Sequence, residues 1–511
     1  MAETADVVET VKQGYAFEGP AIELGALLVD GEPKPDAAVR IPLSMVNRHG
    51  LVAGATGTGK TKTLQLMAEQ LSAAGVAVFA ADIKGDLSGV SQPGQESEKL
   101  LARTKTIGQE WTGSGFPTEF YALGGQGTGI PIRATITSFG PVLLSKVLGL
   151  NDVQESSLGL IFHYADSNGL TLLDLKDLRA VITHLTSDEG KADLKDLGGL
   201  SAATAGVILR SLIGFADQGA EAFFGEPEFD TADLMQQRDG KGVVSLLELP
   251  NLQDRPALFS TFLMWLLADL FHDLPEVGDV DKPKLVFFFD EAHLLFADAS
   301  KAFLTAIAQT VRLIRSKGVG VFFVTQTPKD VPDDVLAQLG SRVQHQLRAH
   351  TPNDAKALKA TVSTFPTSTY DLAEVLTQLG IGEAIVTVMN EKGAPTPVAW
   401  TRLRAPQSLM APATAEQLSA SVQASPNNAK YSEVVDRESA YEKLAAKVQA
   451  GAEQAEAEAK AEPEPKAAPR PQKQEKSMVE QVVGSSAFKQ FARSAGREIV
   501  RGLFGAARRK R

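Results

Sequence analysis

One eight-residue motif constrains this chain more than any other feature of its sequence. The segment GATGTGKT, residues 54–61, fits the pattern G-x-x-x-x-G-K-[S/T] without deviation. An apolar run at residues 51–53 precedes it and a helical pattern follows it, which is the strand, loop and helix context that this phosphate-binding motif requires. The glycines let successive backbone N–H groups turn toward an anion, and the helix start adds its dipole. We therefore expect an α/β core that binds a nucleoside triphosphate.

The chemistry of the loop assigns a task to two of its side chains. Lys60 is predicted to reach the β- and γ-phosphates of ATP, and Thr61 to bind Mg²⁺ through its hydroxyl. The alternative is a Gly/Thr-rich turn that holds no ligand. The residues predicted to line the nucleotide site are Gly54, Ala55, Thr56, Gly57, Thr58, Gly59, Lys60 and Thr61.

Two adjacent carboxylates end an apolar run much later in the chain. Residues 285–289 read LVFFF and are followed by Asp290 and Glu291. On a central parallel strand these side chains would emerge at the carboxyl edge, where ligands bind in open α/β sheets. Asp290 is the expected Mg²⁺ partner and Glu291 the group that polarises the attacking water. The alternative is a helix N-cap.

A second apolar run, residues 319–325, ends in Gln326 and follows Arg315. Gln326 is predicted to sense the γ-phosphate or orient the water, the alternative being a strand-end cap. Arg315 is predicted to stabilise phosphoryl charge in its own subunit or a neighbour's. A solvated helix end, where cations complement the helix dipole, is the other interpretation of Arg315.

The rest of the chain alternates strand-like and helical patterns, which predicts an α/β fold with a mostly parallel central sheet. Expected strands lie at 51–53, 76–82, 242–249, 284–290, 319–325, 342–349 and 382–389. The predicted domains are a strand-rich lead-in at 1–45, an ATPase core at 46–405 with a helical insertion at about 136–240, a helical and Pro-rich charged linker at 406–476, and a basic amphipathic helix at 477–511.

Charge and composition narrow the partners and the compartment. The net charge of −11 argues against a uniformly basic nucleic-acid coat, although residues 477–511 carry a local charge of +6. The longest apolar run, residues 258–271, is shorter than the roughly 20 residues of a membrane span. The polar N-terminus lacks a secretory signal and the chain contains no cysteine, so we expect a cytoplasmic protein without a transmembrane segment.

These motifs together resemble the HerA/FtsK-type P-loop motor ATPases, and most closely the bacterial HerA-like ATPases of unassigned function that lack a full N-terminal barrel. The resemblance covers residues 20–405 and implies a RecA-like core, a hexameric ring and active sites at subunit interfaces. It also implies that Arg315 is a trans arginine finger, with Arg342 as a second candidate. The segment before the loop is short for the HerA barrel, and no winged-helix module is found. The matching segments are Arg48-His49-Gly50 ahead of the loop, Asp82-Ile83-Lys84-Gly85-Asp86, FFFDEAH, RSKGVGVFFVTQ, Ser341-Arg342-Val343 and Gly382-Glu383-Ala384.

Three functional hypotheses follow. The first is a Mg²⁺-dependent ring ATPase that moves DNA or RNA, and the second is an ATP-dependent regulatory or assembly protein that acts on a protein partner through its tail. The third, a small-molecule kinase, seldom needs a glutamate beside the metal-binding aspartate. The tail itself could be a nucleic-acid arm, a helix on a membrane surface or a helix packed on the core.

Overall fold

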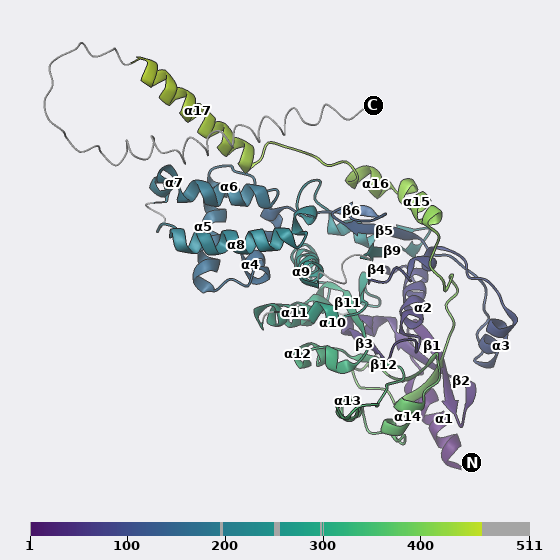
Figure 1. The fold of residues 1–511 in the computed structure, drawn as a ribbon. Helices are drawn as coiled ribbons and strands as arrows, with labels where there is room; N and C mark the ends of the chain where they lie inside the picture. The colour runs from purple at the N-terminus through teal and green to yellow at the C-terminus, as the bar shows by residue number, and fades with distance from the viewer. Residues whose placement is uncertain are drawn as a thin grey trace, which may run out of the picture. The chain divides into compact units, whose positions relative to one another are not determined.

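A computed structural model of the protein describes residues 2–194, 198–249, 256–278, 280–296, 299 and 301–461. The described chain is built around a 12-stranded sheet with the order β2-β1-β14-β13-β12-β3-β11-β10-β4-β9-β5-β6, drawn in Figure 1. The strands are β1 (Ala21–Val29), β2 (Glu32–Pro42), β3 (Gly50–Ala53), β4 (Ala77–Asp82), β5 (Thr118–Leu123), β6 (Ile130–Ile132), β9 (Val244–Glu248), β10 (Leu285–Phe289), β11 (Val319–Thr325), β12 (Ser341–Gln344), β13 (Glu383–Thr387) and β14 (Ala399–Leu403), beside a separate two-stranded ribbon of β7 (Gln237–Arg238) and β8 (Lys241–Gly242).

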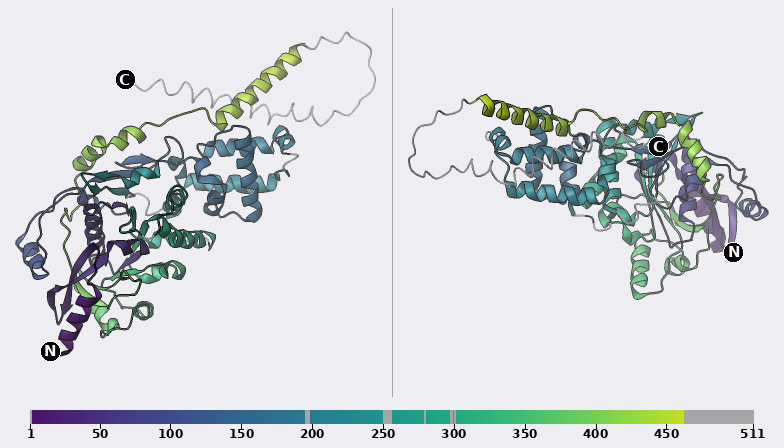
Figure 2. Two further views of the ribbon diagram at one scale, coloured as in Figure 1. Left: turned by 180° about the vertical axis from the view of Figure 1, so that it is seen from behind. Right: turned by 45° about the horizontal axis from the view of Figure 1, so that its top comes forward.

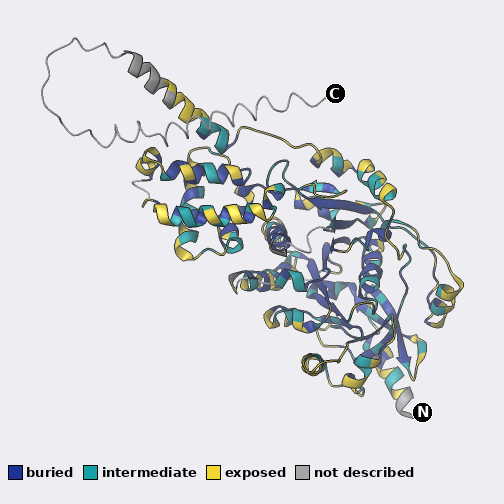
Figure 3. Cartoon of the chain, viewed as in Figure 1, coloured by how far each residue is buried: buried dark blue, intermediate teal, exposed yellow. Residues whose placement is uncertain are grey.

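The half of the sheet from β12 to β6 is parallel. Its central strands are buried along their whole length, as Figure 3 shows. Strands covered on both faces are rich in Val, Ile, Leu and Phe without polar alternation, which is why the runs at β4, β10 and β11 were recognisable in the sequence. The expectation of an α/β fold with a mostly parallel sheet is confirmed.

Helices cover both faces of this parallel half. Alternate residues of β10 separate into two cores: Phe287 and Phe289 pack on the face that carries α9 and α11, whereas Val286 and Phe288 face α2. The helices are α1 (Ala2–Gly14), α2 (Lys60–Ala73), α3 (Glu98–Thr106), α4 (Ile136–Val147), α5 (Asp152–Ser167), α6 (Leu175–Thr186), α7 (Asp188–Asp193), α8 (Ala202–Asp217), α9 (Pro256–Asp273), α10 (His293–Phe296), α11 (Lys301–Ile314), α12 (Asp333–Leu336), α13 (Pro352–Val362), α14 (Leu372–Gln378), α15 (Ala415–Ala424), α16 (Pro426–Tyr431) and α17 (Ala440–Ala461).

Helices α4 to α8 lie together between β6 and the β7–β8 ribbon and form a helical block, seen from two further directions in Figure 2. Several of them begin with side-chain caps, as at Asn151 and Asp174, where the side chain accepts the amide of the third helical residue. Their apolar faces join the core that also contains α9, so the block continues the hydrophobic core of the sheet. Among the described residues, every helix is too short or too polar to cross a membrane.

The N-terminal segment extends the sheet. The hairpin of β1 and β2 joins β14 by antiparallel pairing, and α1 precedes it with Val11 and Tyr15 buried. The Tyr15 hydroxyl donates to the carbonyls of Val386 and Pro397, at 3.2 and 2.9 Å. The sequence predicted a strand-rich segment at residues 1–45, and the helix α1 was not expected. The central sheet continues through β1 and β2.

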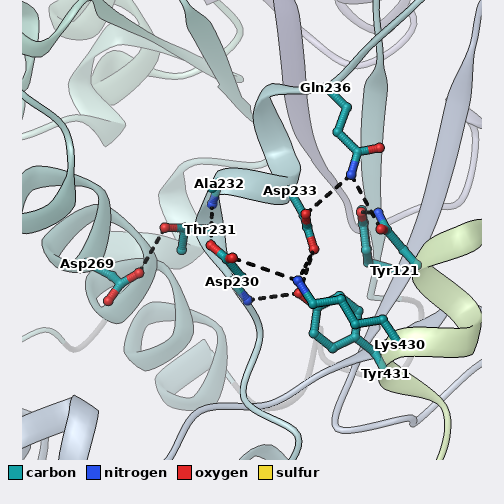
Figure 4. Close-up of polar contacts among 10 residues, drawn as sticks. Tyr121, Asp230, Thr231, Ala232, Asp233, Gln236, Asp269, Lys430 and Tyr431 are labelled. Carbon is teal, nitrogen blue, oxygen red and sulfur yellow. Dashed lines mark hydrogen bonds and ion pairs between the residues drawn. The ribbon is translucent and has the colours of Figure 1, made fainter.

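The segment that follows β14 returns across the parallel half. Residues 405–413, here called the strap, cross the phosphate-loop helix α2, and α16 then anchors near β5. Figure 4 shows this anchor: the Tyr431 hydroxyl donates to Asp233 at 2.6 Å, and Lys430 lies 2.9 Å from the same carboxylate. The chain divides into two units after Lys447, and the described part of the second unit is the end of α17, residues 448–461. The strap and α16 are bonded to Glu69 and Tyr121, which belong to the first unit. The domain boundaries proposed from the sequence, at residues 45, 405 and 476, stay predictions. The predicted basic helix at 477–511 lies outside the described residues.

Candidate nucleotide site

Four parallel strands end beside one another at the carboxyl edge of the sheet, and each is followed by polar residues. In spatial order these strands are β3, β11, β10 and β4. The phosphate loop follows β3, Gln326 follows β11, the Asp290-Glu291 pair follows β10, and Lys84 lies just after β4. One strand therefore separates the loop from the carboxylates, and that strand carries the glutamine. The carboxyl edge of a parallel sheet is where α/β proteins bind ligands.

The phosphate loop is held by backbone contacts to the neighbouring strands. The amide of Gly54 donates to Thr325 at 3.2 Å, and the amide of Ala55 donates to Gln346 at 2.8 Å. Helix α2 then begins at Lys60 after a left-handed Gly59, whose φ is 114°, and no described side chain caps its first turn. The free amides at this helix start suit an anion. The Lys60 ammonium group donates to the Ala55 carbonyl at 3.2 Å, so it lies over the loop.

A buried histidine supports the loop from below. Gly54 has a φ of +156°, and a Cβ at this position would lie 2.4 Å from the Cβ of His345. The Nε2 of His345 lies 2.9 Å from the Thr63 hydroxyl on α2. Burial, and then the charge of Lys60, lower the pKa of His345 to about 4. His345 is therefore neutral at physiological pH, and only glycine fits above it.

Lys60 and both carboxylates share one electrostatic environment. Burial lowers the pKa of Lys60, while the charges of Glu291 and Asp290 act on it in the opposite direction. The charge of Lys84 adds to the effect of burial. These groups are distant in the sequence, and the order of strands brings them together. A triphosphate bound at the loop would meet two lysines and two carboxylates.

Asp290 has a carboxylate oxygen that the protein leaves free. Its Oδ1 accepts the amide of Glu291 at 2.9 Å, whereas Oδ2 is buried and has no hydrogen-bond partner. Burial, and then the negative charge of Glu291, raise the pKa of Asp290 to about 7. A cation beside Oδ2 would relieve this cost. Mg²⁺ is typically held by one or two protein oxygens together with substrate phosphates. The unpartnered Oδ2 of Asp290 fits such an ion. The described residues contain no cluster of three or more His, Cys, Asp or Glu side chains for a metal.

Glu291 is held in an unusual conformation. Its φ is +48°, a left-handed value that costs non-glycine residues free energy and is often retained at functional sites. Its Oε1 forms an ion pair with Lys84, and Oε2 lies 3.2 Å from Nδ1 of His293. Burial raises the pKa of Glu291, but the hydrogen bond and charge of Lys84, together with the charges of His293 and Lys60, lower it by more, so the pKa falls below the usual value. Glu291 is therefore ionised.

Two further acids lie beside this site on adjacent strand ends. Asp82 of β4 pairs in register with Glu248 of β9. Burial raises the pKa of Asp82 to about 6, and burial followed by the charge of Asp82 raises that of Glu248 to about 7. The Asp82 carboxylate accepts amides from Gly85 and Leu87, both at 2.8 Å. It therefore fixes the turn that carries Lys84.

The other two residues predicted for catalysis, Gln326 and Arg315, lie at opposite ends of β11. Gln326 is exposed directly after β11, at the same edge as the loop and the carboxylates. Arg315 is exposed on the short helix Arg315–Lys317 before β11, at the opposite edge. A seven-residue strand spans about 23 Å, so Arg315 does not reach the site of its own chain. Arg342 hydrogen-bonds to Thr364 and lies over the ring of Phe365, within its own chain.

Sequence reasoning assigned no role to Lys84 or His345. Lys84 had a signal, because it stands two residues after the last residue of β4, but its partner depends on β4 lying next to β10 in the sheet. His345 had none, since a histidine at the end of a strand is usually a satisfied core residue.

Comparisons with known proteins identify the relatives of this chain. The helicase HerA-like C-terminal family matches residues 28–511. The DNA double-strand break repair helicase HerA of Sulfurisphaera tokodaii is 23% identical over 378 residues, covering 72% of this chain and 67% of that protein. HerA of Saccharolobus solfataricus is 23% identical over 384 residues, covering 74% and 68%. Among solved structures, the unbound bacterial conjugative coupling protein TrwB has a TM-score of 0.51 at 15% identity, covering 79% of this chain and 94% of that one. TrwB in complex with ADP and Mg²⁺ has a TM-score of 0.50 at 16% identity, covering 76% and 96%.

Proposed function

Because this chain belongs to the helicase HerA-like C-terminal family and is a P-loop ATPase of the HerA/FtsK motor class, we propose that it is a ring-forming, Mg²⁺-dependent ATPase that moves nucleic acid. The observation that carries the proposal is the arrangement at the carboxyl edge of the sheet. The phosphate loop and the Asp290-Glu291 pair end strands that are separated only by β11, which supplies Gln326.

The reaction follows from this arrangement. The loop amides and Lys60 hold the triphosphate, with Thr61 and Asp290 available to the metal, which would neutralise phosphate charge when bound. Glu291 accepts a proton as water attacks the γ-phosphorus, the bond to the β–γ bridging oxygen breaks, and ADP and inorganic phosphate leave. Gln326 orients that water from the neighbouring strand. The buried, ionised carboxylate supports the assignment of Glu291 as the base.

Two substitutions test this site. Lys60→Ala is expected to abolish ATP binding, because it removes the cation that contacts the loop. Glu291→Gln is expected to bind ATP and hydrolyse it about 100-fold more slowly or worse, since a general base typically contributes that much. Glu96→Gln, on an exposed loop, is the matched control. Removal of Mg²⁺ with a chelator should stop turnover and be reversed by added Mg²⁺. Wild-type hydrolysis in Glu291→Gln would contradict the assignment.

A ring is proposed because Arg315 lies at the wrong edge for its own site. An exposed arginine there can stabilise phosphoryl charge only in an adjacent copy. The test mixes Arg315→Ala with Glu291→Gln, each inactive alone. Mixed rings are expected to regain part of the activity, because some interfaces join an intact Glu291 to an intact Arg315. Native mass measurement with and without ATP gives the ring size, and a monomer under both conditions would contradict the proposal.

Nucleic acid is the proposed substrate polymer, as the names of the HerA relatives indicate for those proteins. Net charge of −11 confines phosphate contacts to a local surface. We expect DNA or RNA to increase ATP turnover, and the increase to fall steeply with salt. A rate that no single- or double-stranded polymer alters would favour the alternative, an ATPase that regulates or assembles a protein partner. Retention of one protein partner after nuclease treatment would then identify that function.

A further inference from the structure

We propose that Lys84 is a positioning residue that holds Glu291 in an ion pair between turnovers and so restrains ATP hydrolysis. The inference rests on the proposed role of Glu291 as the base. It concerns a residue outside the phosphate loop and the carboxylate pair, located on the turn after β4.

The ion pair is asymmetric in its exposure to solvent. The side chain of Glu291 is only 7% exposed, whereas that of Lys84 is 42% exposed. The second oxygen of Glu291 is buried without a hydrogen bond, 3.2 Å from Nδ1 of His293. Lys84 is therefore the main stabilising partner of a charge that cannot turn to water. Because Lys84 can reach solvent and Glu291 cannot, Lys84 is the partner able to leave.

The turn presents Lys84 to Glu291 in a fixed place. Asp82 accepts amides from Gly85, Asp86 and Leu87, at 2.8, 3.2 and 2.8 Å. Gly85 has a φ of +72°, which lets the chain reverse immediately after Lys84. Since β4 pairs directly with β10, the turn faces the carboxylate pair across one strand spacing. The backbone therefore fixes both partners of the contact, Lys84 through the turn after β4 and Glu291 through its position at the end of β10.

This contact opposes the chemistry expected of Glu291. A carboxylate that accepts a hydrogen bond from an ammonium group has that oxygen engaged and unavailable to a water molecule. To take a proton from water, Glu291 must break its bond to Lys84 or accept a second hydrogen bond beside it. The γ-phosphate of ATP would arrive close to Lys60, near both Lys84 and Glu291, and its negative charge competes for Lys84. Filling the site therefore weakens the restraint.

The segment directly after the turn, residues 88–92, is bonded to the strap. The Ser88 hydroxyl accepts the amide of Ala413 at 3.0 Å, and the Gln92 carbonyl accepts that of Leu409 at 2.9 Å. On its other side the strap is bonded to Glu69 of α2, the helix that begins in the phosphate loop. Movement of α2 on nucleotide binding can thereby reach the turn that carries Lys84. The restraint and the phosphate loop are mechanically connected.

The test measures ATP turnover without any polymer in Lys84→Met. Removing a partly exposed ion pair of this kind is expected to raise turnover about threefold to tenfold. The Kd for ATP should stay within about twofold, and stimulation by nucleic acid should shrink because the basal rate is already raised. Lys84→Arg should keep the low basal rate. Lys99→Met, at an exposed position on α3, is the matched control and should behave as wild type.

Two outcomes decide the inference, and one further outcome concerns the proposed function. A rate that rises in Lys84→Met and stays low in Lys84→Arg supports the inference, because a merely structural defect lowers turnover. An unchanged or lower rate with normal ATP binding overturns it and makes Lys84 a group that assists hydrolysis. Lys84→Gln replaces the methionine variant in the same measurements if that variant does not fold. If the wild-type protein did not hydrolyse ATP, that result would refute the proposed function itself.

Discussion

Replacing Glu69 should loosen the strap from the phosphate-loop helix. The Glu69 carboxylate is 2% exposed and accepts the amides of Gln407 and Ser408, at 2.8 and 2.9 Å, as well as the Ser408 hydroxyl. Glu69→Ala leaves three donors without this acceptor, two of them buried and the Gln407 amide partly buried, and each buried donor costs about 1–3 kcal/mol. Water that enters the vacated space offsets part of this cost, so we expect a net loss of about 3 kcal/mol.

Hydrogen exchange at the strap measures this loss locally. A free-energy change of about 3 kcal/mol corresponds to roughly 100-fold faster exchange of the Gln407 and Ser408 amides. Glu69→Gln retains one acceptor oxygen and should lose about 1–2 kcal/mol. Glu96→Ala, on an exposed loop, is the control and should leave both amides protected. If Glu69→Ala accelerated exchange by less than about threefold while the chain stayed folded, this carboxylate would not hold the strap.

Three further predictions concern the loop, the acid pair and the core. Gly54→Ala should abolish ATP binding measured by titration, because its Cβ would meet His345 at 2.4 Å, whereas Gly159→Ala, which meets nothing within 4 Å, should bind normally. Burial raises the folded-state pKa of Glu248 to about 7, so the stability that its protonated form contributes is present below the usual glutamate pKa and is lost as pH rises through about 7. Glu248→Gln should therefore gain stability relative to wild type between about pH 4.5 and 7, and the difference should then level off. Denaturant titrations at several pH values measure this difference. Phe262→Ala, at a fully buried position against Phe223 and Trp265, should cost about 3–5 kcal/mol in the same assay, and a cost below about 1 kcal/mol would contradict its place in the core.

The parallel core was predictable because its strands are buried on both faces. The runs that became β4, β10 and β11 have few polar interruptions, and each ends in the residues that define the site. The strands β5 and β14 contain polar residues such as Glu119 and Arg402, so their pattern gave a weaker signal. The family resemblance was confirmed by the match to residues 28–511.

The contacts around the site depend on strand order, which a single sequence does not specify. Lys84 meets Glu291 only because β4 lies beside β10. The strap was missed for a similar reason: residues 405–413 contain neither a strand nor a helix pattern, and their bonds to Glu69 become apparent only once α2 is in place. The proposed roles of Glu291, Gln326 and Arg315 remain predictions for the experiments above.

Trimming this protein at the change in composition after residue 405 would be a poor choice for laboratory work. Such a fragment would keep every sequence motif of the ATPase and still lose the groups that bind Glu69 of α2 and the Trp111 indole. Its failure to turn over ATP could then be mistaken for a missing cofactor. Fragments that end after Lys447 keep the whole first compact unit and are the sounder starting point.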